Sequence, residues 1–130
     1  MDLVIVTILY NQRIENTITY KSLLGCEKTI TKQFKNYKLI LYDNSFNKQT
    51  HSSNDKLRSI YFHNPDNGGV SAAYNFGYNT AKVYNYKWLL LLDQDTCINE
   101  NYIQELSYAI KKINSSKNIV AIVPKIVNKS

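Results

Sequence analysis

The amino-acid sequence predicts an α/β fold in which a mostly parallel sheet carries helices on both faces. Short apolar runs rich in β-branched residues alternate with segments of helical periodicity, and polar residues follow the runs directly. Strands that are separated by helices must return in parallel, through right-handed crossovers. The expected strands are residues 3–10, 38–42, 59–63, 86–92 and 118–123.

The helices are predicted from the spacing of apolar residues between these runs. Apolar residues recur every three or four positions in residues 99–114, and one face of residues 70–83 is apolar or small. Residues 16–24 also have helical character. Residues 26–37 are compatible with a further short helix, whereas residues 46–57 are polar and turn-like. The resulting order, β-α-β-β-α-β-α-β, is typical of nucleotide-binding sheets.

The composition limits the functions that the chain can have. Its 130 residues fit one globular domain spanning 1–130, with 44% apolar and 20% charged residues. A net charge of +6 favours phosphorylated ligands. Because the Lys and Arg residues come singly, no nucleic-acid partner is expected, and a basic nucleic-acid binder would rest on charge alone.

The cysteines and the lack of membrane signals predict a cytoplasmic location. Cys26 and Cys97 have neither metal nor redox spacing, and so few cysteines fit a reducing compartment. We expect Cys97 to be a small core residue. No apolar run is long enough to cross a bilayer, and no signal peptide is expected. The basic charge is compatible with peripheral attachment to the inner membrane face.

An apolar run that ends in two acids is the central motif. Residues 88–92 are five consecutive apolar residues, which is typical of a strand covered on both faces in the middle of a parallel sheet. Asp93 and Asp95 follow, and on an extended backbone they point the same way and repel each other. Mg²⁺ or Mn²⁺ relieves such repulsion and prefers one or two carboxylates together with phosphate oxygens. The alternative is a polar turn that caps the next helix.

Two further polar motifs follow expected strands. Asp43 closes the second strand, and Gly68 and Gly69 precede the central helix. Free N–H groups at a helix N-terminus suit an anion, although a glycine pair also serves as a tight turn. Because the carboxyl ends of parallel strands meet at one edge of a sheet, we expect Asp43, the glycine pair and the two acids to gather there.

Four motifs occur in an order and spacing that match a known family. They are Val6-Thr7 with Tyr10-Asn11, residues 42–45, residues 67–77, and residues 89–96 with an Asp-X-Asp motif. Together they resemble the N-terminal half of a family 2 glycosyltransferase with the GT-A fold, most closely the bacterial rhamnosyltransferase-like branch. The resemblance covers nearly the whole chain and implies a Rossmann-like nucleotide-binding sheet. We expect the acceptor half of the enzyme to lie beyond residues 1–130.

The resemblance implies roles for three residues near the nucleoside of a nucleotide-diphosphate sugar. Tyr10 would lie beside the base, and Asp43 would accept a hydrogen bond from the base or the ribose. Asp93 would contact the ribose or the sugar. The expected donor is a UDP- or dTDP-linked hexose or deoxyhexose.

The resemblance also implies a site for the diphosphate and its metal ion. Asn67 and Gly68 would line the sugar-diphosphate, and Asp95 would hold the Mn²⁺ or Mg²⁺ that bridges it. Tyr74 is a departure from the family pattern, because many relatives place an arginine near the diphosphate at this point of the helix.

The implied reaction is inverting transfer of the sugar to an acceptor hydroxyl, as in cell-surface polysaccharide synthesis. The acceptor would be a saccharide or a lipid-linked sugar. Such a reaction needs a general base within hydrogen-bond reach of the acceptor hydroxyl. We find no candidate in residues 1–130, because Asp66, Glu100 and Glu105 flank helices or lie on them.

Two other functions are compatible with part of the sequence. A sugar-1-phosphate nucleotidyltransferase shares the sheet and the acids, but it needs a glycine-rich loop after the first strand, and Asn11-Gln12-Arg13 contains no glycine. A nucleotide-sugar-binding or assembly module without catalysis stays open, because the acceptor half is not expected in this chain. An uncovered sheet edge would favour self-association.

Overall fold

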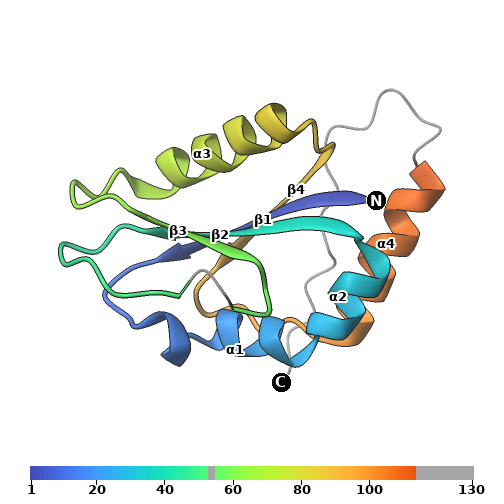
Figure 1. Ribbon diagram of the computed structural model, residues 1–130, viewed down its shortest axis with the longest axis horizontal. Helices are drawn as coiled ribbons and strands as arrows, with labels where there is room; N and C mark the ends of the chain where they lie inside the picture. The colour runs from blue at the N-terminus through green and yellow to red at the C-terminus, as the bar shows by residue number, and fades with distance from the viewer. Residues whose placement is uncertain (53–54, 114–130) are drawn as a thin grey trace, which may run out of the picture.

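The computed structural model describes residues 1–52 and 55–113 and confirms the predicted fold class. Its four strands form one parallel sheet in the order β3-β2-β1-β4 (Figure 1). The strands are β1 (Asp2–Leu9), β2 (Asn36–Asp43), β3 (Ser59–His63) and β4 (Trp88–Asp93). The strand that is predicted at residues 118–123 lies outside the described residues.

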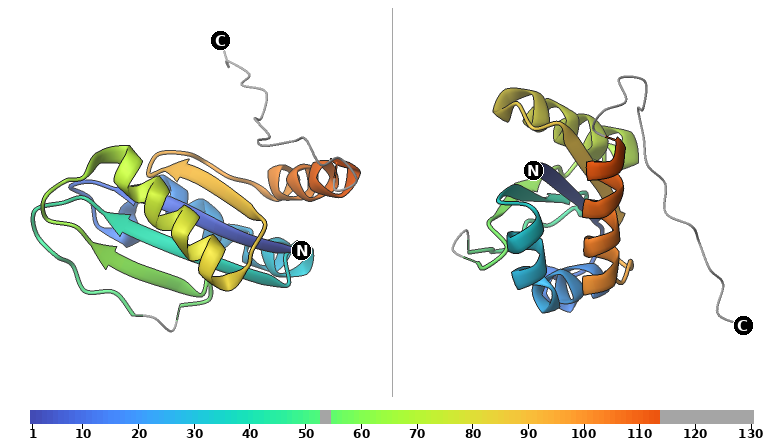
Figure 2. Two further views of the ribbon diagram at one scale, coloured as in Figure 1. Left: turned by 90° about the horizontal axis from the view of Figure 1, so that it is seen from above. Right: turned by 90° about the vertical axis from the view of Figure 1, so that its right-hand side faces the viewer.

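Helices cover both faces of the sheet. α3 (Gly69–Tyr84) lies on one face, and α1 (Ile18–Gly25), α2 (Glu27–Gln33) and α4 (Glu100–Ile113) lie on the other (Figure 1, Figure 2). A 3-10 turn, η1 (Ile14–Asn16), connects β1 to α1. None of these helices is both long and apolar enough to cross a membrane.

β1 lies in the interior of the sheet because both of its faces are apolar. Leu3, Ile5 and Leu9 pack in the core formed with α1, α2 and α4. Val4 and Val6 pack in the core formed with α3. All five side chains are at most 1% exposed. The alternating directions of side chains along a strand therefore give β1 one buried face for each helical layer.

α3 packs close to the sheet because its buried face is made of small residues. Ala73, Gly77 and Ala81 are its buried positions. A side chain at Gly77 would overlap Val6 of β1, so only glycine fits there. The helix ends close to its predicted limit, because Asn85 adopts a left-handed conformation with a φ of 57°.

The structure refines two predictions about helices near the N-terminus. α1 begins at Ile18 and not at residue 16, because the Thr17 side chain caps the helix and accepts a hydrogen bond from the Tyr20 amide at 3.3 Å. Asn16 belongs to η1 instead. The weaker pattern in residues 26–37 does contain a helix, α2.

Two predictions about burial are wrong. Residues 88–92 are predicted to be covered on both faces, but Leu91 is 37% exposed. Within the described residues β4 is an edge strand of the sheet. Apolar runs of this kind do not reveal which strands will pair beside them. Cys97 is exposed and does not belong to the core, because Ile98 takes the buried position in the loop before α4.

Candidate functional site

The carboxyl ends of the strands bring the predicted polar residues to one edge of the sheet. The register places Ile8 of β1 opposite Asp93 of β4, and Leu9 of β1 opposite Asp43 of β2. Tyr10 follows β1 directly, so it emerges between the two acidic strand ends. α3 begins at the same edge, which lies on the left in Figure 1.

A cavity at this edge joins three of the predicted residues. It has a volume of about 270 Å³ and is lined by Ile8, Tyr10, Asp93, Gln94 and Asp95. The Tyr10 side chain is 50% exposed, and both acids are exposed. Within the described chain, the carboxylates of Asp93 and Asp95 make no hydrogen bond or ion pair. β4 ends at Asp93, so Asp95 lies in a turn and not on the extended backbone that was expected, yet both acids border one cavity.

Gln94 fixes the shape of this cavity by binding the backbone of Tyr10 at two points. Its Oε1 accepts a hydrogen bond from the Tyr10 amide at 2.9 Å, and its Nε2 donates to the Tyr10 carbonyl oxygen at 3.2 Å. The residue between the two acids thus holds the end of β1 against the turn after β4. No role for Gln94 follows from the sequence pattern, although a carboxamide offers the donor and the acceptor that such a contact needs.

Thr19 of α1 holds the acidic turn from the core side. Its fully buried hydroxyl donates to the Asp93 carbonyl oxygen and accepts from the Thr96 amide at 2.8 Å. Its own amide donates to the Gln94 carbonyl oxygen at 3.1 Å. α1 therefore positions the backbone on which both acids stand, a role that the sequence pattern does not reveal.

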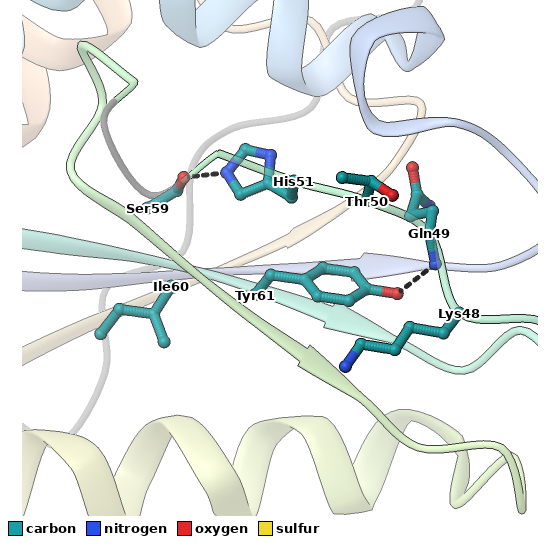
Figure 3. A pocket seen from close by; sticks show the side chains of 7 residues that line it. All are labelled: Lys48, Gln49, Thr50, His51, Ser59, Ile60 and Tyr61. Atoms are coloured by element: carbon teal, nitrogen blue, oxygen red, sulfur yellow. Dashed lines mark hydrogen bonds between the residues drawn. The ribbon is translucent and has the colours of Figure 1, made fainter.

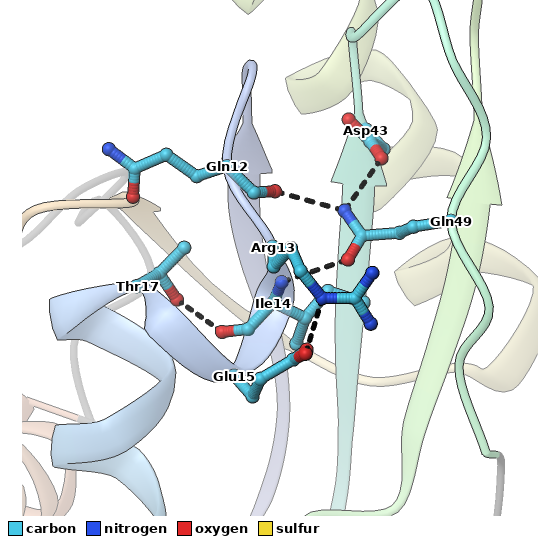
Figure 4. A network of polar contacts seen from close by, with 7 residues as sticks. All are labelled: Gln12, Arg13, Ile14, Glu15, Thr17, Asp43 and Gln49. Atoms are coloured by element: carbon cyan, nitrogen blue, oxygen red, sulfur yellow. Dashed lines mark hydrogen bonds and ion pairs between the residues drawn. The ribbon is translucent and has the colours of Figure 1, made fainter.

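Asp43 differs from the cavity acids because it is buried and fully engaged in hydrogen bonds. Its Oδ1 accepts from the Ser45 amide at 3.0 Å, and its Oδ2 accepts from the Tyr61 hydroxyl at 2.7 Å. The Gln49 side chain also donates to Oδ2, at 3.1 Å (Figure 4). Asp43 lies at the predicted edge, but its carboxylate is occupied by groups of the protein itself.

The surroundings keep Asp43 ionised and Tyr61 protonated at neutral pH. Burial acts to raise the pKa of Asp43, but the hydrogen bonds that it accepts, led by those from Ser45 and Tyr61, outweigh burial and lower the pKa below its usual value. Burial, together with the neighbouring Asp43 carboxylate, raises the pKa of Tyr61 to about 12. Asp43 is therefore a fixed acceptor and Tyr61 a fixed donor.

The loop before α3 needs its two glycines for different reasons. A side chain at Gly68 would approach the side chains of Ala72 and Asn64 to 2.7 and 2.8 Å, which is too close. Gly69 has a φ of 73°, in the left-handed region that favours glycine. Asn67 lies in the same region with a φ of 46° and is exposed. The tight turn and the helix start, which the sequence offers as alternatives, are therefore both present.

Hydrogen bonds tie this loop to the end of β2. The Asn44 side chain donates to the Gly69 carbonyl oxygen at 3.3 Å, and the Asn64 amide donates to the Asp43 carbonyl oxygen at 2.8 Å. Asn44 is buried, and its Oδ1 has no partner among the described residues. The start of α3 is therefore held next to Asp43.

A comparison with protein families decides what kind of protein this is. The family model described as Glycosyl transferase family 2 matches residues 4–129, nearly the whole sequence. The chain belongs to glycosyltransferase family 2. No curated protein and no solved structure gives a significant match. Membership in a glycosyltransferase family implies binding of a nucleotide-sugar donor and of an acceptor.

The cavity of this glycosyltransferase offers ligands that suit a hard divalent cation. Asp93 and Asp95 supply carboxylate oxygens. Among residues 1–52 and 55–113, no three His, Cys, Asp or Glu side chains form a metal site by themselves. A bound ion would take its remaining ligands from water or phosphate, which is the usual arrangement for Mg²⁺. Burial and the charge of Asp93 raise the pKa of Tyr74, so its hydroxyl is neutral and adds no positive charge to this edge.

The predicted residues of this glycosyltransferase fall into three groups along the edge. Tyr10, Asp93 and Asp95 share one cavity. Asp43 lies in its own hydrogen-bond network at the end of the neighbouring strand. The Asn67-Gly68 turn precedes α3. The groups follow from the strand ends that the sequence marks, whereas the side chains that connect them come from elsewhere in the chain.

Proposed function

We propose that this domain binds the nucleotide-diphosphate sugar for an inverting, metal-dependent glycosyl transfer. The observation that carries the proposal is the cavity in which Tyr10 meets the carboxylates of Asp93 and Asp95, which are unpaired among residues 1–52 and 55–113. Two neighbouring acids without partners favour a divalent cation, and the carboxyl edge of a parallel sheet favours a phosphorylated ligand. The proposed donor carries UDP or dTDP, as the rhamnosyltransferase-like motif suggests.

The nucleoside is proposed to lie at the ends of β1 and β2. The ring of Tyr10 is half exposed beside the cavity, so that a base can lie against it. Asp43 is ionised and serves as the proposed acceptor for a hydrogen bond from the base or the ribose. Asp93 is the proposed contact of the ribose or the sugar.

The diphosphate is proposed to lie between the acidic turn and the start of α3. Asn67 and Gly68 come directly before the N-terminus of α3, where free N–H groups and the helix dipole attract an anion. Asp95 would hold Mn²⁺ or Mg²⁺, which when bound neutralises charge on the leaving diphosphate.

The acceptor and the general base are proposed to belong to another part of the enzyme. Asp93 and Asp95 are the acids in the cavity lining, and both are assigned to the donor. An inverting attack needs a further base near the acceptor hydroxyl. The proposed acceptor is a saccharide or lipid-linked sugar of a cell-surface polysaccharide, used on the cytoplasmic side of the membrane.

A nucleotide-sugar-binding module without catalysis is the second candidate. The cavity lining favours it, because both acids in that lining, Asp93 and Asp95, are assigned to the donor and neither is left to act as a general base. Donor binding without turnover is the property expected if no base reaches this cavity. Release of UDP or dTDP from the nucleotide sugar, in the presence of saccharide acceptors, separates the two candidates because only an enzyme turns the donor over.

Calorimetric titration of UDP and of dTDP tests the donor site. The wild-type protein should bind at least one of them with Mn²⁺ and lose this binding in EDTA. Asp95→Asn should abolish the metal-dependent part of binding. Glu105→Gln, which removes the charge of an exposed carboxylate on α4, is the matched control and should bind like the wild type. A folded protein that binds neither nucleotide under any of these conditions would contradict the proposal.

A further inference from the structure

The Gln49 side chain fills a polar niche beside Asp43. Its Nε2 donates to Asp43 Oδ2 at 3.1 Å and to the Gln12 carbonyl oxygen at 3.0 Å. Its Oε1 accepts from the Ile14 amide at 2.9 Å. Figure 4 shows how the carboxamide of Gln49 bridges the end of β2 and the segment that follows β1.

The niche has the hydrogen-bonding pattern of a receptor for a planar amide. The Asp43 carboxylate and the Gln12 carbonyl are acceptors, and the Ile14 amide is a donor. A planar group with an N–H next to a C=O satisfies an acceptor and a donor at once. The carboxamide of glutamine has this pattern. The lactam edge of uracil or thymine has it too, with N3–H beside C4=O, but its single N–H serves one of the two acceptors, Asp43, and leaves the Gln12 carbonyl to water.

We propose that Gln49 occupies the nucleobase subsite of the free protein and that the pyrimidine base of the donor displaces it. The inference rests on the proposed function, because it takes Asp43 as the acceptor for the base. It adds that the protein competes with its own ligand for Asp43.

The segment that carries Gln49 can move without disturbing the core. We call residues 46–50, which lie between β2 and β3, the strap. Phe46 is 80% exposed, and the strap stays exposed through Lys48. Gln49 is only partly exposed and anchors the strap through its side chain and through its amide, which donates to the Tyr61 hydroxyl at 3.1 Å. The side chain of Gln49 can therefore leave the niche while its amide stays bonded to Tyr61.

Space for the displaced side chain lies beside the strap. A cavity of about 620 Å³ is lined by residues 48–51 and, from the edge strand β3, by residues 59–61 (Figure 3). Gln49 borders this cavity as well as the niche. A carboxamide side chain is much smaller than this volume, so Gln49 can rotate into the cavity while its backbone stays near Tyr61.

The exchange keeps the buried carboxylate of Asp43 paired. The Ser45 amide and the Tyr61 hydroxyl still donate to Asp43 after Gln49 leaves. The N–H of the base replaces the lost donor, which a buried carboxylate needs. Competition lowers the apparent affinity, because the base binds only the fraction of molecules in which the niche is open.

Calorimetric titration of UDP with Mn²⁺ tests the inference on the wild type, Gln49→Ala and Asn47→Ala. Both substitutions remove a carboxamide from the strap, but Asn47 is exposed and lies outside the niche. Gln49→Ala should bind UDP about tenfold more tightly, as expected if the niche is open in roughly one wild-type molecule in ten. Asn47→Ala should match the wild type. Pyrophosphate with Mn²⁺, which has no base, should bind all three proteins equally.

The possible results separate this inference from the proposed function. If Gln49→Ala and the wild type bind UDP equally well, Gln49 does not compete and the inference fails alone. If Gln49→Ala binds UDP more weakly while pyrophosphate binding is unchanged, Gln49 contacts the nucleotide and the inference again fails. If no protein binds either UDP or dTDP although all are folded, both the inference and the donor site are wrong.

Nuclear magnetic resonance provides a second test on the unaltered chain. The side-chain NH₂ signals of Gln49, assigned by their absence in Gln49→Ala, should shift when UDP and diamagnetic Mg²⁺ are added. They should not shift with pyrophosphate and Mg²⁺. Signals that stay in place in the UDP-bound protein would overturn the displacement.

Discussion

The edge of the sheet carries two kinds of acid, and their difference shows how the site is divided. Asp93 and Asp95 are exposed and unpaired within the described chain, whereas Asp43 is buried and accepts three hydrogen bonds. Unpaired neighbouring carboxylates favour a cation. A carboxylate that already accepts hydrogen bonds from neutral donors binds a ligand by exchanging one of these donors for a neutral donor of the ligand. The cavity acids therefore suit the charged part of a ligand, and Asp43 suits a neutral part.

Replacing each kind of acid by asparagine should separate them most strongly. Asp43→Asn places an NH₂ group among buried donors and leaves donors unpaired, so the free energy of unfolding should fall by about 2–4 kcal/mol. Asp95→Asn should change it by less than about 0.5 kcal/mol, because this side chain is exposed and has no hydrogen bond or ion pair to the described part of the chain. Urea unfolding of both variants measures the difference. An equal loss of unfolding free energy in the two variants would mean that Asp43 is not held by its hydrogen bonds more firmly than Asp95.

Thr19→Val tests how far the cavity acids depend on support from the core. The substitution leaves the Asp93 carbonyl and the Thr96 amide without their shared partner, so the free energy of unfolding should fall by about 1–3 kcal/mol. Binding of UDP with Mn²⁺ should weaken too, because the acidic turn loses its position.

Thr80→Val is the matched control for this change. The Thr80 hydroxyl donates to the Phe76 carbonyl oxygen at 2.8 Å, so its hydrogen bond stays within α3. UDP should bind this variant like the wild type. Unchanged UDP affinity in Thr19→Val itself would show that the turn positions its acids without α1.

Acid should weaken the folded protein through Asp43. Its pKa is lower in the folded protein than in the unfolded chain, where it is about 4, so its stabilising effect is complete above that value. The effect is lost as the pH falls through the lower, folded-state pKa. The difference in unfolding free energy between the wild type and Asp43→Asn should therefore shrink below about pH 4. Urea unfolding at a series of pH values measures it, and a difference that stays constant into strong acid would refute the pKa shift.

The smallest effect is expected at Thr7, where the same chemical change as in Thr19→Val should have the opposite sign. Thr7 on β1 is fully buried, and its hydroxyl has no partner among the described residues. Thr7→Val removes an unpaired polar group at nearly constant volume, so stability should rise by up to about 1 kcal/mol. Thermal unfolding measures this, and a lower melting temperature would show that the hydroxyl is paired after all.

The residues that end the strands could be predicted from the sequence, but the residues that hold them could not. Asp43 and Asp93 directly follow apolar runs, so their place at a strand end is local information. Thr19 and Gln49 act on residues 74 and 35 positions away. Contacts over such separations depend on how the chain folds back, and no spacing within one segment reports them.

Burial was harder to predict than secondary structure for the same reason. The run in β4 is equally apolar whether a strand covers its second side or not, so its place at the edge of the described sheet could not be foreseen. Cys97 and Ile98 are neighbours of similar character. The path of the loop decides which of them turns inward, and here it is Ile98.

The tight contact between Gly77 and Val6 fixes the distance that a ligand at the sheet edge must span. Because α3 rests on β1 without room for a further methyl group, the helix cannot slide or tilt to suit a longer or shorter ligand. Backbone packing therefore sets the span from Tyr10, at the end of β1, to Gly68, at the start of α3. We expect the site to prefer ligands whose length matches this span. Nucleoside monophosphates, which are too short to reach both ends, should bind far more weakly than diphosphates in the same titrations.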